Sequence, residues 1–347
     1  MIRFNNSIKL IIFILFILTA CTGDKDLLSL FENEKKIKSE IIELSDNDII
    51  AKPFLLTFLD SFITLSDVYG DKLFTAIDLS KKNAFRFGKI GHGPGEFLIG
   101  TFCSRYNSTR DLYLFNSPAK KLYKTSIDSF IRNPDYNPRK HLTFNAPEIV
   151  KLNMFSDSLF IAQGRFGEYR LALYNNKGEI LNAILKYPQY KESNNQYYYS
   201  LVYQGKLSIK PDDLKFVHIT YKSSNIGFYE IKDEKIHVIK EIFLQNPIMQ
   251  LTPVGNMYAC IPDKDCIYGY LDVYTTKKFI YALYSDDKVN DNEASSSNIL
   301  VFDWNGQPIK ILKLDNKVTF ICASDNDSFI YAISHNDEKI FILSYKL

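Results

Sequence analysis

Side chains that could do acid–base, nucleophilic or metal chemistry are present, but they are not grouped along the chain. The five histidines (His92, His141, His218, His237 and His335) are scattered, and none lies at the spacing that metal sites use. There is no Gly-x-Ser-x-Gly turn, no His-Glu-x-x-His motif and no Cys-x-x-Cys pair. The sequence therefore predicts no catalytic residue, no metal site formed by a short sequence motif, and no cofactor.

A glycine-rich stretch has two interpretations. It contains Gly91, Gly93, Pro94, Gly95, Glu96 and Phe97. Glycine-rich loops hold phosphate when they begin a helix or end in Gly-Lys-Ser/Thr. Here a strand-like run follows, and the Glu96 carboxylate would repel phosphate. We expect a structural turn, with glycines at positive φ and Phe97 packed into the next structural unit.

The most suggestive group for ligand contact is aromatic. Tyr197, Tyr198 and Tyr199 lie in a long Asn/Gln/Ser-containing segment that also contains Tyr187 and Tyr203. Tyrosine presents a rigid amphipathic face to sugars or peptides. In a strand, at least one of Tyr197 to Tyr199 would be buried, because successive side chains alternate sides. We take these three as candidate binding residues, with packing of an outer strand as the alternative.

The N-terminus has the three parts of an export signal. Arg3 and Lys9 are basic, residues 10–18 are uninterruptedly apolar, and small residues then lead to Cys21. The run Leu-Thr-Ala-Cys at 18–21 resembles a bacterial lipobox, which implies cleavage before Cys21 and a lipid on its sulfur. The apolar run is about half of the roughly 20 residues that cross a bilayer. We predict a signal peptide at 1–20 and a membrane anchor through lipid on Cys21; a plain secretory signal is the alternative.

The remaining cysteines are Cys103, Cys260, Cys266 and Cys322. Outside the cytoplasm an even number permits disulfides. Cys260 and Cys266 are close in sequence, so a local disulfide between them is one possibility. Cys103 and Cys322 lie in apolar strand contexts, which favours small buried side chains.

The charge of the exported chain is balanced. Of 42 basic residues, Arg3 and Lys9 belong to the signal, which leaves 40 basic and 40 acidic residues. Such a surface has no net field to attract nucleic acid or anionic lipid, so nucleic acid is not an expected partner.

An apolar strand preceded by a polar turn residue recurs six times. Successive copies end 39, 47, 57, 63 and 50 residues apart. The copies are residues 71–76, 111–115, 157–162, 215–219, 277–282 and 327–332. Strand-rich units at about 40 to 50 residues are typical of four-stranded propeller blades. The two longest steps would carry insertions.

These repeats predict an all-β fold, a six-bladed β-propeller at residues 40–347. A lipidated N-terminus and tether at 21–39 would precede it. A strand near 41–44 could complete the last blade and remove its open edge. A β-sandwich followed by a second β domain is the alternative.

Residues 85–97, which contain the stretch Gly-His-Gly-Pro-Gly-Glu-Phe, resemble a segment of TolB-like six-bladed propeller lipoproteins. The segments at 269–271, 278–284 and 301–306 resemble that family's last blades. The resemblance covers most of the chain after the signal and implies a six-bladed propeller on a lipid anchor. It implies no catalytic residues.

Two functions follow as hypotheses. The first is a non-catalytic binding module in the cell envelope, anchored at the outer membrane, with a protein, peptide or glycan partner. The alternative is a metal-dependent hydrolase or lactonase, with acidic side chains or asparagines from at least three blades converging at one end of the channel.

Overall fold

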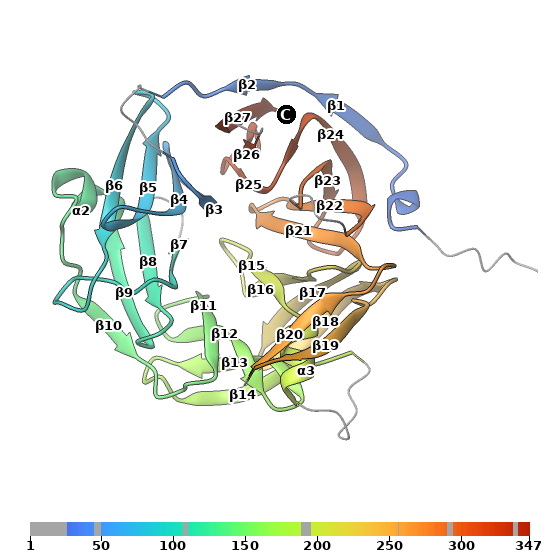
Figure 1. Cartoon of the computed structure of the whole chain (residues 1–347), viewed down its shortest axis with the longest axis horizontal. Helices are drawn as coiled ribbons and strands as arrows, with labels where there is room; N and C mark the ends of the chain where they lie inside the picture. The colour runs from blue at the N-terminus through green and yellow to red at the C-terminus, as the bar shows by residue number, and fades with distance from the viewer. Residues whose placement is uncertain are drawn as a thin grey trace, which may run out of the picture.

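Six β-sheets are arranged around a central axis like the blades of a propeller (Figure 1). The computed structural model describes residues 26–44, 50–106, 110–188, 196–255, 257–289, 294–335 and 339–347. Each blade has an innermost strand at the axis and adds strands outward by antiparallel pairing, apart from one parallel N-terminal strand at the outer edge of the fifth blade. The expected six-bladed propeller is therefore confirmed.

Blades 1 to 3 each contain four consecutive strands. Blade 1 is built from β3 (Pro53–Leu59), β4 (Phe62–Tyr69), β5 (Lys72–Asp78) and β6 (Asn83–Lys89). Blade 2 is built from β7 (Thr101–Arg105), β8 (Asp111–Asn116), β9 (Lys121–Ser126) and β10 (Lys140–Thr143). Blade 3 is built from β11 (Ile149–Met154), β12 (Leu159–Phe166), β13 (Tyr169–Asn175) and β14 (Ile180–Lys186).

Blades 5 and 6 each take one strand from the N-terminus. Blade 4 is built from β15 (Gly205–Ile209), β16 (Lys215–Thr220), β17 (Asn225–Lys232) and β18 (Lys235–Phe243). Blade 5 is built from β21 (Ile267–Thr275), β22 (Ile280–Lys288), β23 (Ser296–Phe302), β24 (Pro308–Val318) and β1 (Glu34–Ile37). Blade 6 is built from β25 (Phe320–Ala323), β26 (Phe329–His335), β27 (Ile340–Lys346) and β2 (Ser39–Ile41).

Five of the six repeated strands are the second strands of their blades: β8, β12, β16, β22 and β26. The copy at 71–76 is instead the third strand, β5. The true counterpart in blade 1 is β4, which follows the turn at Asp60 and Ser61 as β26 follows Asp327 and Ser328. Asp60 and Asp327 both turn the chain at positive φ (58° and 57°).

The N-terminal strands close the ring. β2 pairs antiparallel with β27, and the Ile42 amide donates to the Ile342 carbonyl at 2.8 Å. The strand expected near 41–44 thus lies slightly earlier, at Ser39–Ile41, and covers the outer edge of blade 6 as expected.

Residues 26–39 were expected to be a tether, but they pack on the propeller. β1 pairs parallel with β24, and the short 3₁₀ helix η1 (Leu28–Leu30) precedes it. Leu27 and Phe31 are buried, and the Phe31 ring meets Phe302 edge-to-face with centroids 5.1 Å apart. Apolar side chains of the segment and of blade 5 account for its attachment, because their burial stabilises the docked chain.

The blades are held together by apolar faces between neighbours. Phe144, on the connection from blade 2 to blade 3, meets Phe115 of one blade and Phe160 of the next, at 6.1 and 5.7 Å. The helix α2 (Ile127–Arg132) buries Phe130 against Phe87 of blade 1, at 4.7 Å. Edge-to-face and tilted aromatic pairs of this kind suit wedge-shaped gaps between twisted sheets.

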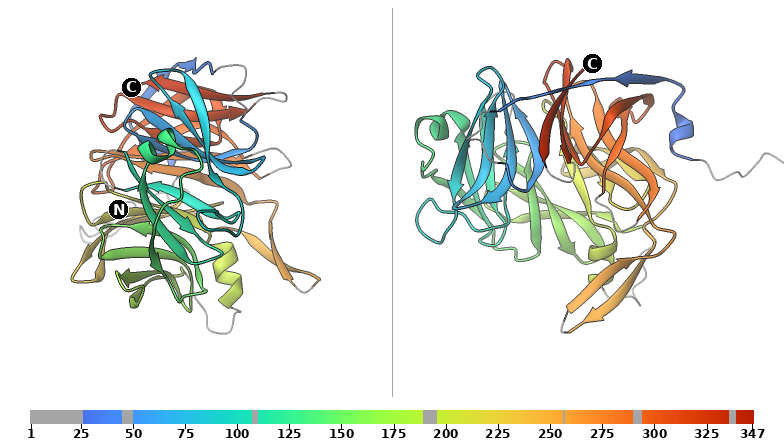
Figure 2. Two further views of the ribbon diagram at one scale, coloured as in Figure 1. Left: turned by 90° about the vertical axis from the view of Figure 1, so that its left-hand side faces the viewer. Right: turned by 45° about the horizontal axis from the view of Figure 1, so that its top comes forward.

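The two longest repeat steps contain the two insertions, as expected. The step between blades 3 and 4 contains the helix α3 (Gln196–Val202), and the step between blades 4 and 5 contains the hairpin of β19 (Met249–Val254) and β20 (Met257–Pro262). Figure 2 shows α3 and this hairpin extending beyond the ring. The two insertions contact each other, since Met249 and Cys260 pack on the aromatic cluster around α3.

Candidate functional site

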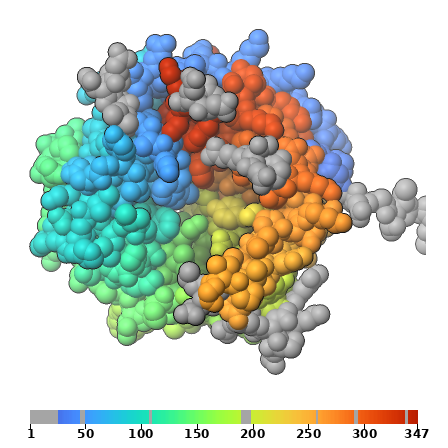
Figure 3. Space-filling model, in the orientation of Figure 1, coloured from blue at the N-terminus to red at the C-terminus, as the bar shows by residue number. Residues whose placement is uncertain are grey.

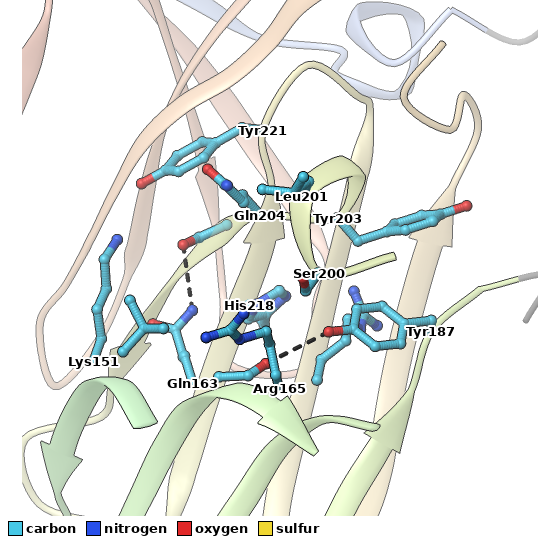
Figure 4. Close-up of a pocket in the computed structure, with 14 residues that line it drawn as sticks. Lys151, Gln163, Arg165, Tyr187, Ser200, Leu201, Tyr203, Gln204, His218 and Tyr221 are labelled. Carbon is cyan, nitrogen blue, oxygen red and sulfur yellow. Dashed lines mark hydrogen bonds between the residues drawn. The ribbon is translucent and has the colours of Figure 1, made fainter. Parts of the chain in front are cut away.

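A cavity of about 280 Å³ lies between blades 3 and 4 and is roofed by α3. In Figure 4, Lys151 lies on one side of it, and Tyr187 and Tyr203 lie on the other. Its lining consists of Val150, Lys151, Gln163, Gly164, Arg165, Arg170, Tyr187, Ser200, Leu201, Tyr203, Gln204, Gly205, His218 and Tyr221. The volume is close to the lower end of the range for small-molecule sites.

The floor of the cavity is polar and ordered by hydrogen bonds between the two blades. Gln163 Nε2 on β12 donates to the Gly205 carbonyl at the start of β15, at 3.2 Å (Figure 4). A side chain at Gly205 would clash, because its Cβ would lie 1.9 Å from the Ile219 carbonyl oxygen and 3.0 Å from His218 Cε1. Glycine at this position therefore allows the innermost strand to approach His218.

The roof is an aromatic cluster formed by the first insertion. Tyr199 and Tyr203 of the α3 region pack with Tyr187, with ring centroids 5.6 to 6.3 Å apart. Tyr187 and Tyr203 also line the cavity, so their faces are shared between packing and the open space. The Tyr187 hydroxyl donates to the Gly164 carbonyl at 3.5 Å, which orients the ring.

Arg170 is the most unusual residue of the site. It is only 4% exposed, and burial lowers the pKa of its guanidinium, although an arginine stays charged at neutral pH. Its Nη1 donates to Thr220 Oγ1 at 3.3 Å, whereas its Nε has no hydrogen-bond partner. The nearby Glu241 carboxylate accepts from the Tyr229 hydroxyl at 2.8 Å, and no described carboxylate forms an ion pair with Arg170.

Lys151 and His218 complete the electrostatics. Lys151 lies on the innermost strand β11, and burial lowers its pKa to about 8, with further lowering by the charge of Lys206. Its Nζ lies 5.8 and 5.9 Å from the ring centroids of Phe102 and Tyr221. Burial, together with the charges of Arg170 and Lys151, holds the pKa of His218 well below its usual value. His218 is therefore neutral at pH 7.

The central channel is a second, smaller cavity of about 120 Å³, lined by inner strands of several blades. Figure 3 shows the surface dipping toward the axis on one face of the ring. The carboxylates of Asp272 and Asp325 form ion pairs with Lys206 and Arg105. In the described part of the chain, no three His, Cys, Asp or Glu side chains converge as metal ligands. These residues give the hydrolase alternative no site.

The predicted tyrosines are part of a helix and not of a strand. α3 spans Tyr197, Tyr198 and Tyr199 and packs on β12 of blade 3. Tyr199 is buried in the aromatic cluster and Tyr198 is half-buried against it. The side chain of Tyr197 lies outside the described part. Of the wider aromatic segment, it is Tyr187 and Tyr203 that line the cavity.

The glycine-rich stretch forms a turn between blades 1 and 2. Glu96 Oε2 accepts from the Gly93 amide, and its other oxygen pairs with Lys89, both at 2.8 Å. The peptide bond between Pro94 and Gly95 is trans, and Gly95 has φ +77°. Phe97 is fully buried and meets Tyr123 of blade 2 edge-to-face. The Gly91 amide donates a hydrogen bond to the Phe97 carbonyl at 3.1 Å. The stretch therefore forms a structural connection between blades 1 and 2.

The possible disulfide does not form. Cys260 and Cys266 are free thiols, as are Cys103 and Cys322. Cys260 lies on the inserted hairpin beside the α3 cluster, while Cys266 is buried at the start of blade 5, where its Sγ faces the Lys222 carbonyl at 3.9 Å. The two thiols thus belong to separate packing environments.

Sequence reasoning missed Arg170, Lys151 and His218 as site residues. One signal was present: Arg170 directly precedes the apolar run Leu171–Leu173 in β13. A charged residue within a buried run is costly unless something pairs with it.

The family model for TolB-like six-bladed propellers matches residues 31–326. The chain belongs to this family. Solved structures with the same fold include a DUF4221 family member from Bacteroides vulgatus, with TM-score 0.56 and 11% identity over 90% of this chain and 96% of that one. Another is a putative exported protein from Bacteroides fragilis, with TM-score 0.53 and 13% identity over 93% and 96%.

A third structure is a calcium-binding protein, regucalcin, from Agrobacterium tumefaciens, with TM-score 0.50 and 10% identity over 90% and 96%. At these identities the TolB-like chain shares the fold alone with all three. A search of curated proteins finds no match. The predicted signal and Cys21 lie outside the described residues, and no described helix is long and apolar enough to cross a membrane.

Proposed function

We propose that this TolB-like propeller is a lipid-anchored, non-catalytic binding protein of the cell envelope, with its ligand site in the cavity between blades 3 and 4. The observation that carries the proposal is the buried Arg170, which lines the cavity and whose Nε has no hydrogen-bond partner among the described residues. A buried polar group without a partner costs stability, and a bound ligand is one way to satisfy it.

The composition of the cavity supports binding without catalysis. In the part of the chain that the structure describes, no carboxylate or cysteine lines it, and its polar groups are mainly hydrogen-bond donors and tyrosine hydroxyls. The volume suits a small molecule, or one terminal unit of a glycan or peptide, and not a folded partner. The anchor rests on Cys21 and its lipobox-like context, which favours the outer membrane as the location.

The anchor is tested by labelling cells with a palmitate analogue. We expect label on the native chain and none on Cys21→Ser, which should also be released from the membrane fraction. Label that persists in Cys21→Ser would contradict lipidation at this residue.

Binding is tested with a small-molecule library and the melting temperature of the chain from Thr22 onward, which contains every described strand of the propeller. Gln204 is exposed at the mouth of the cavity, so Gln204→Trp should block entry without disturbing the core. Asn176→Trp puts the same bulk on an exposed turn at the far end of β13 and serves as the matched control.

Compounds that stabilise the wild type and Asn176→Trp should fail to stabilise Gln204→Trp. The proposal is wrong if no compound stabilises the wild type, or if every active compound stabilises both variants equally. Mass spectrometry of the protein extracted from its envelope should also show a small molecule that Gln204→Trp lacks.

A further inference from the structure

The cavity between blades 3 and 4 is positively charged. Lys151, Arg165 and Arg170 line it, and no Asp or Glu among the described residues does. The mature chain as a whole is neutral, so this local excess of positive charge is a property of the site and not of the composition. A concave surface with one sign of charge and low-dielectric walls concentrates its field on the enclosed space.

Two carboxylates that act on Lys151 and Arg170 are already engaged. Asp272 is bound by Lys206 Nζ and by the backbone amides of Val273 and Ile321, at 2.9 and 3.0 Å. Glu241 accepts the Tyr229 hydroxyl, and both Tyr229 and Glu241 interact electrostatically with Arg170. Neither carboxylate belongs to the cavity lining, so the described residues give Lys151 and Arg170 no counter-ion inside the cavity.

The Arg170 guanidinium has more N–H donors than its protein partners use. A guanidinium has five N–H donors, and this one uses Nη1 for a neutral threonine at 3.3 Å while Nε remains unbonded. An anion with two oxygens could accept from the guanidinium in the bidentate manner that makes arginine the preferred partner of carboxylate and phosphate.

We propose that the ligand of this cavity is a small organic anion, whose carboxylate or phosphate group binds Arg170 and Lys151. This inference rests on the proposed function and adds the chemical class of the ligand. The rest of the ligand lies against Tyr187, Tyr203 and Tyr221, whose rings form the apolar part of the lining. A planar or ring-shaped body, such as a sugar acid or an aromatic acid, fits these walls.

The test uses probes that differ only in charge. Benzoate and benzamide have nearly the same shape, so their affinities for the chain from Thr22 onward compare an anion with its neutral analogue. Phenyl phosphate and inorganic phosphate test the second anionic group with and without a ring. Affinities are measured by ligand-observed NMR and calorimetry at pH 7.

Four variants accompany the wild type. Arg170→Met removes the charge, and Arg170→Lys restores a charge without the bidentate fork. Lys151→Met removes the second cation and provides an independent test if Arg170→Met is poorly folded. Arg110→Met is the matched control, because Arg110 pairs with Asp128 on blade 2, outside the cavity.

We expect benzoate to bind the wild type and Arg110→Met at least about tenfold more tightly than benzamide, because a charge-assisted bidentate contact is lost with the neutral probe. Arg170→Met and Lys151→Met should each reduce that ratio severalfold, and Arg170→Lys should recover part of it. Benzamide affinity should change little among the variants.

The inference is overturned if benzoate and benzamide bind the wild type equally, if the ratio survives in both Arg170→Met and Lys151→Met, or if none of the anionic probes binds at 10 mM-scale concentrations typical of weak fragments. Stabilisation by a neutral library compound that Gln204→Trp abolishes would leave the binding function intact and remove only the anionic class. Tighter binding of phenyl phosphate than of benzoate would identify phosphate as the preferred group.

Discussion

Replacing Lys151 by methionine should make the empty protein more stable at neutral pH. Lys151 Nζ is surrounded by the inner strands of the ring, and the described residues provide no ion pair for it. The charges around it are Lys206 on β15, which repels it, and Asp272 on β21, which attracts it but is bound to Lys206. Methionine has a similar length and removes the buried charge.

The size of the effect follows from the lysine pKa. Lowering it from 10.5 to about 8 on folding is equivalent to roughly 3 kcal/mol against the charged form. Contacts of Nζ with the rings of Phe102 and Tyr221, at nearly 6 Å, offset about 0.5 kcal/mol each. Lys151→Met should therefore stabilise the chain by up to about 2 kcal/mol at pH 7.

The stability advantage of Lys151→Met depends on pH in a defined way. Between pH 8 and 10.5 the unfolded lysine holds its proton while the folded one has lost it, so the stability of the wild type rises with pH in this window. The advantage of Lys151→Met should thus shrink by about 2 kcal/mol between pH 7 and pH 9.5. Other titrating groups cancel, because they are common to both proteins.

Urea unfolding of both proteins, followed by tyrosine fluorescence or circular dichroism at pH 7, 8.5 and 9.5, measures this difference. Lys177→Met, on an exposed turn of the same blade, is the control and should change stability by less than about 0.5 kcal/mol. A Lys151→Met protein that is less stable than the wild type at pH 7, or a difference that does not depend on pH, would refute the reasoning.

Three further predictions concern binding, packing and the cysteines. Benzoate affinity should fall above pH 8 as Lys151 loses its proton, and calorimetry should find no such fall in Lys151→Met. Phe97→Ala should destabilise the chain by about 3 to 5 kcal/mol in urea unfolding, because it empties a fully buried site, whereas Ile99→Ala at a 63% exposed position should cost less than about 0.5 kcal/mol. Thiol titration of the unfolded, unreduced chain from Thr22 onward should count all four cysteines as free, and a count of two would show that a disulfide had formed.

The ring and its closure were predictable because they depend on local patterns that repeat. Turn residues before apolar runs fix hairpins, and spacing fixes the number of blades. The register of blade 1 was not read correctly, since β4 and β5 are both buried apolar strands and either one fits the repeat locally. The match of Asp60-Ser61-Phe62-Ile63 to Asp327-Ser328-Phe329-Ile330 would have resolved this.

The cavity could not be predicted, because its residues come from distant strands. Lys151, Arg170 and His218 lie on β11, β13 and β16, and only the packing of blade 3 on blade 4 brings them together. The tyrosine-rich segment lies beside the cavity, and the strand considered for it is a helix. Helix or strand in that short segment is decided by tertiary contacts with blade 3 and the inserted hairpin, and not by its local pattern.

The attachment of the N-terminal segment to blade 5 sets how far the protein can move from its anchor. The first buried residue is Leu27, six positions after Cys21, and a fully extended chain of that length spans about 20 Å. With a lipid on Cys21, the segment between Cys21 and Leu27 is therefore too short for the propeller to move across the width of the periplasm. It would sample only molecules that come to the membrane surface, and blade 5 would be the side of the ring that faces the lipid.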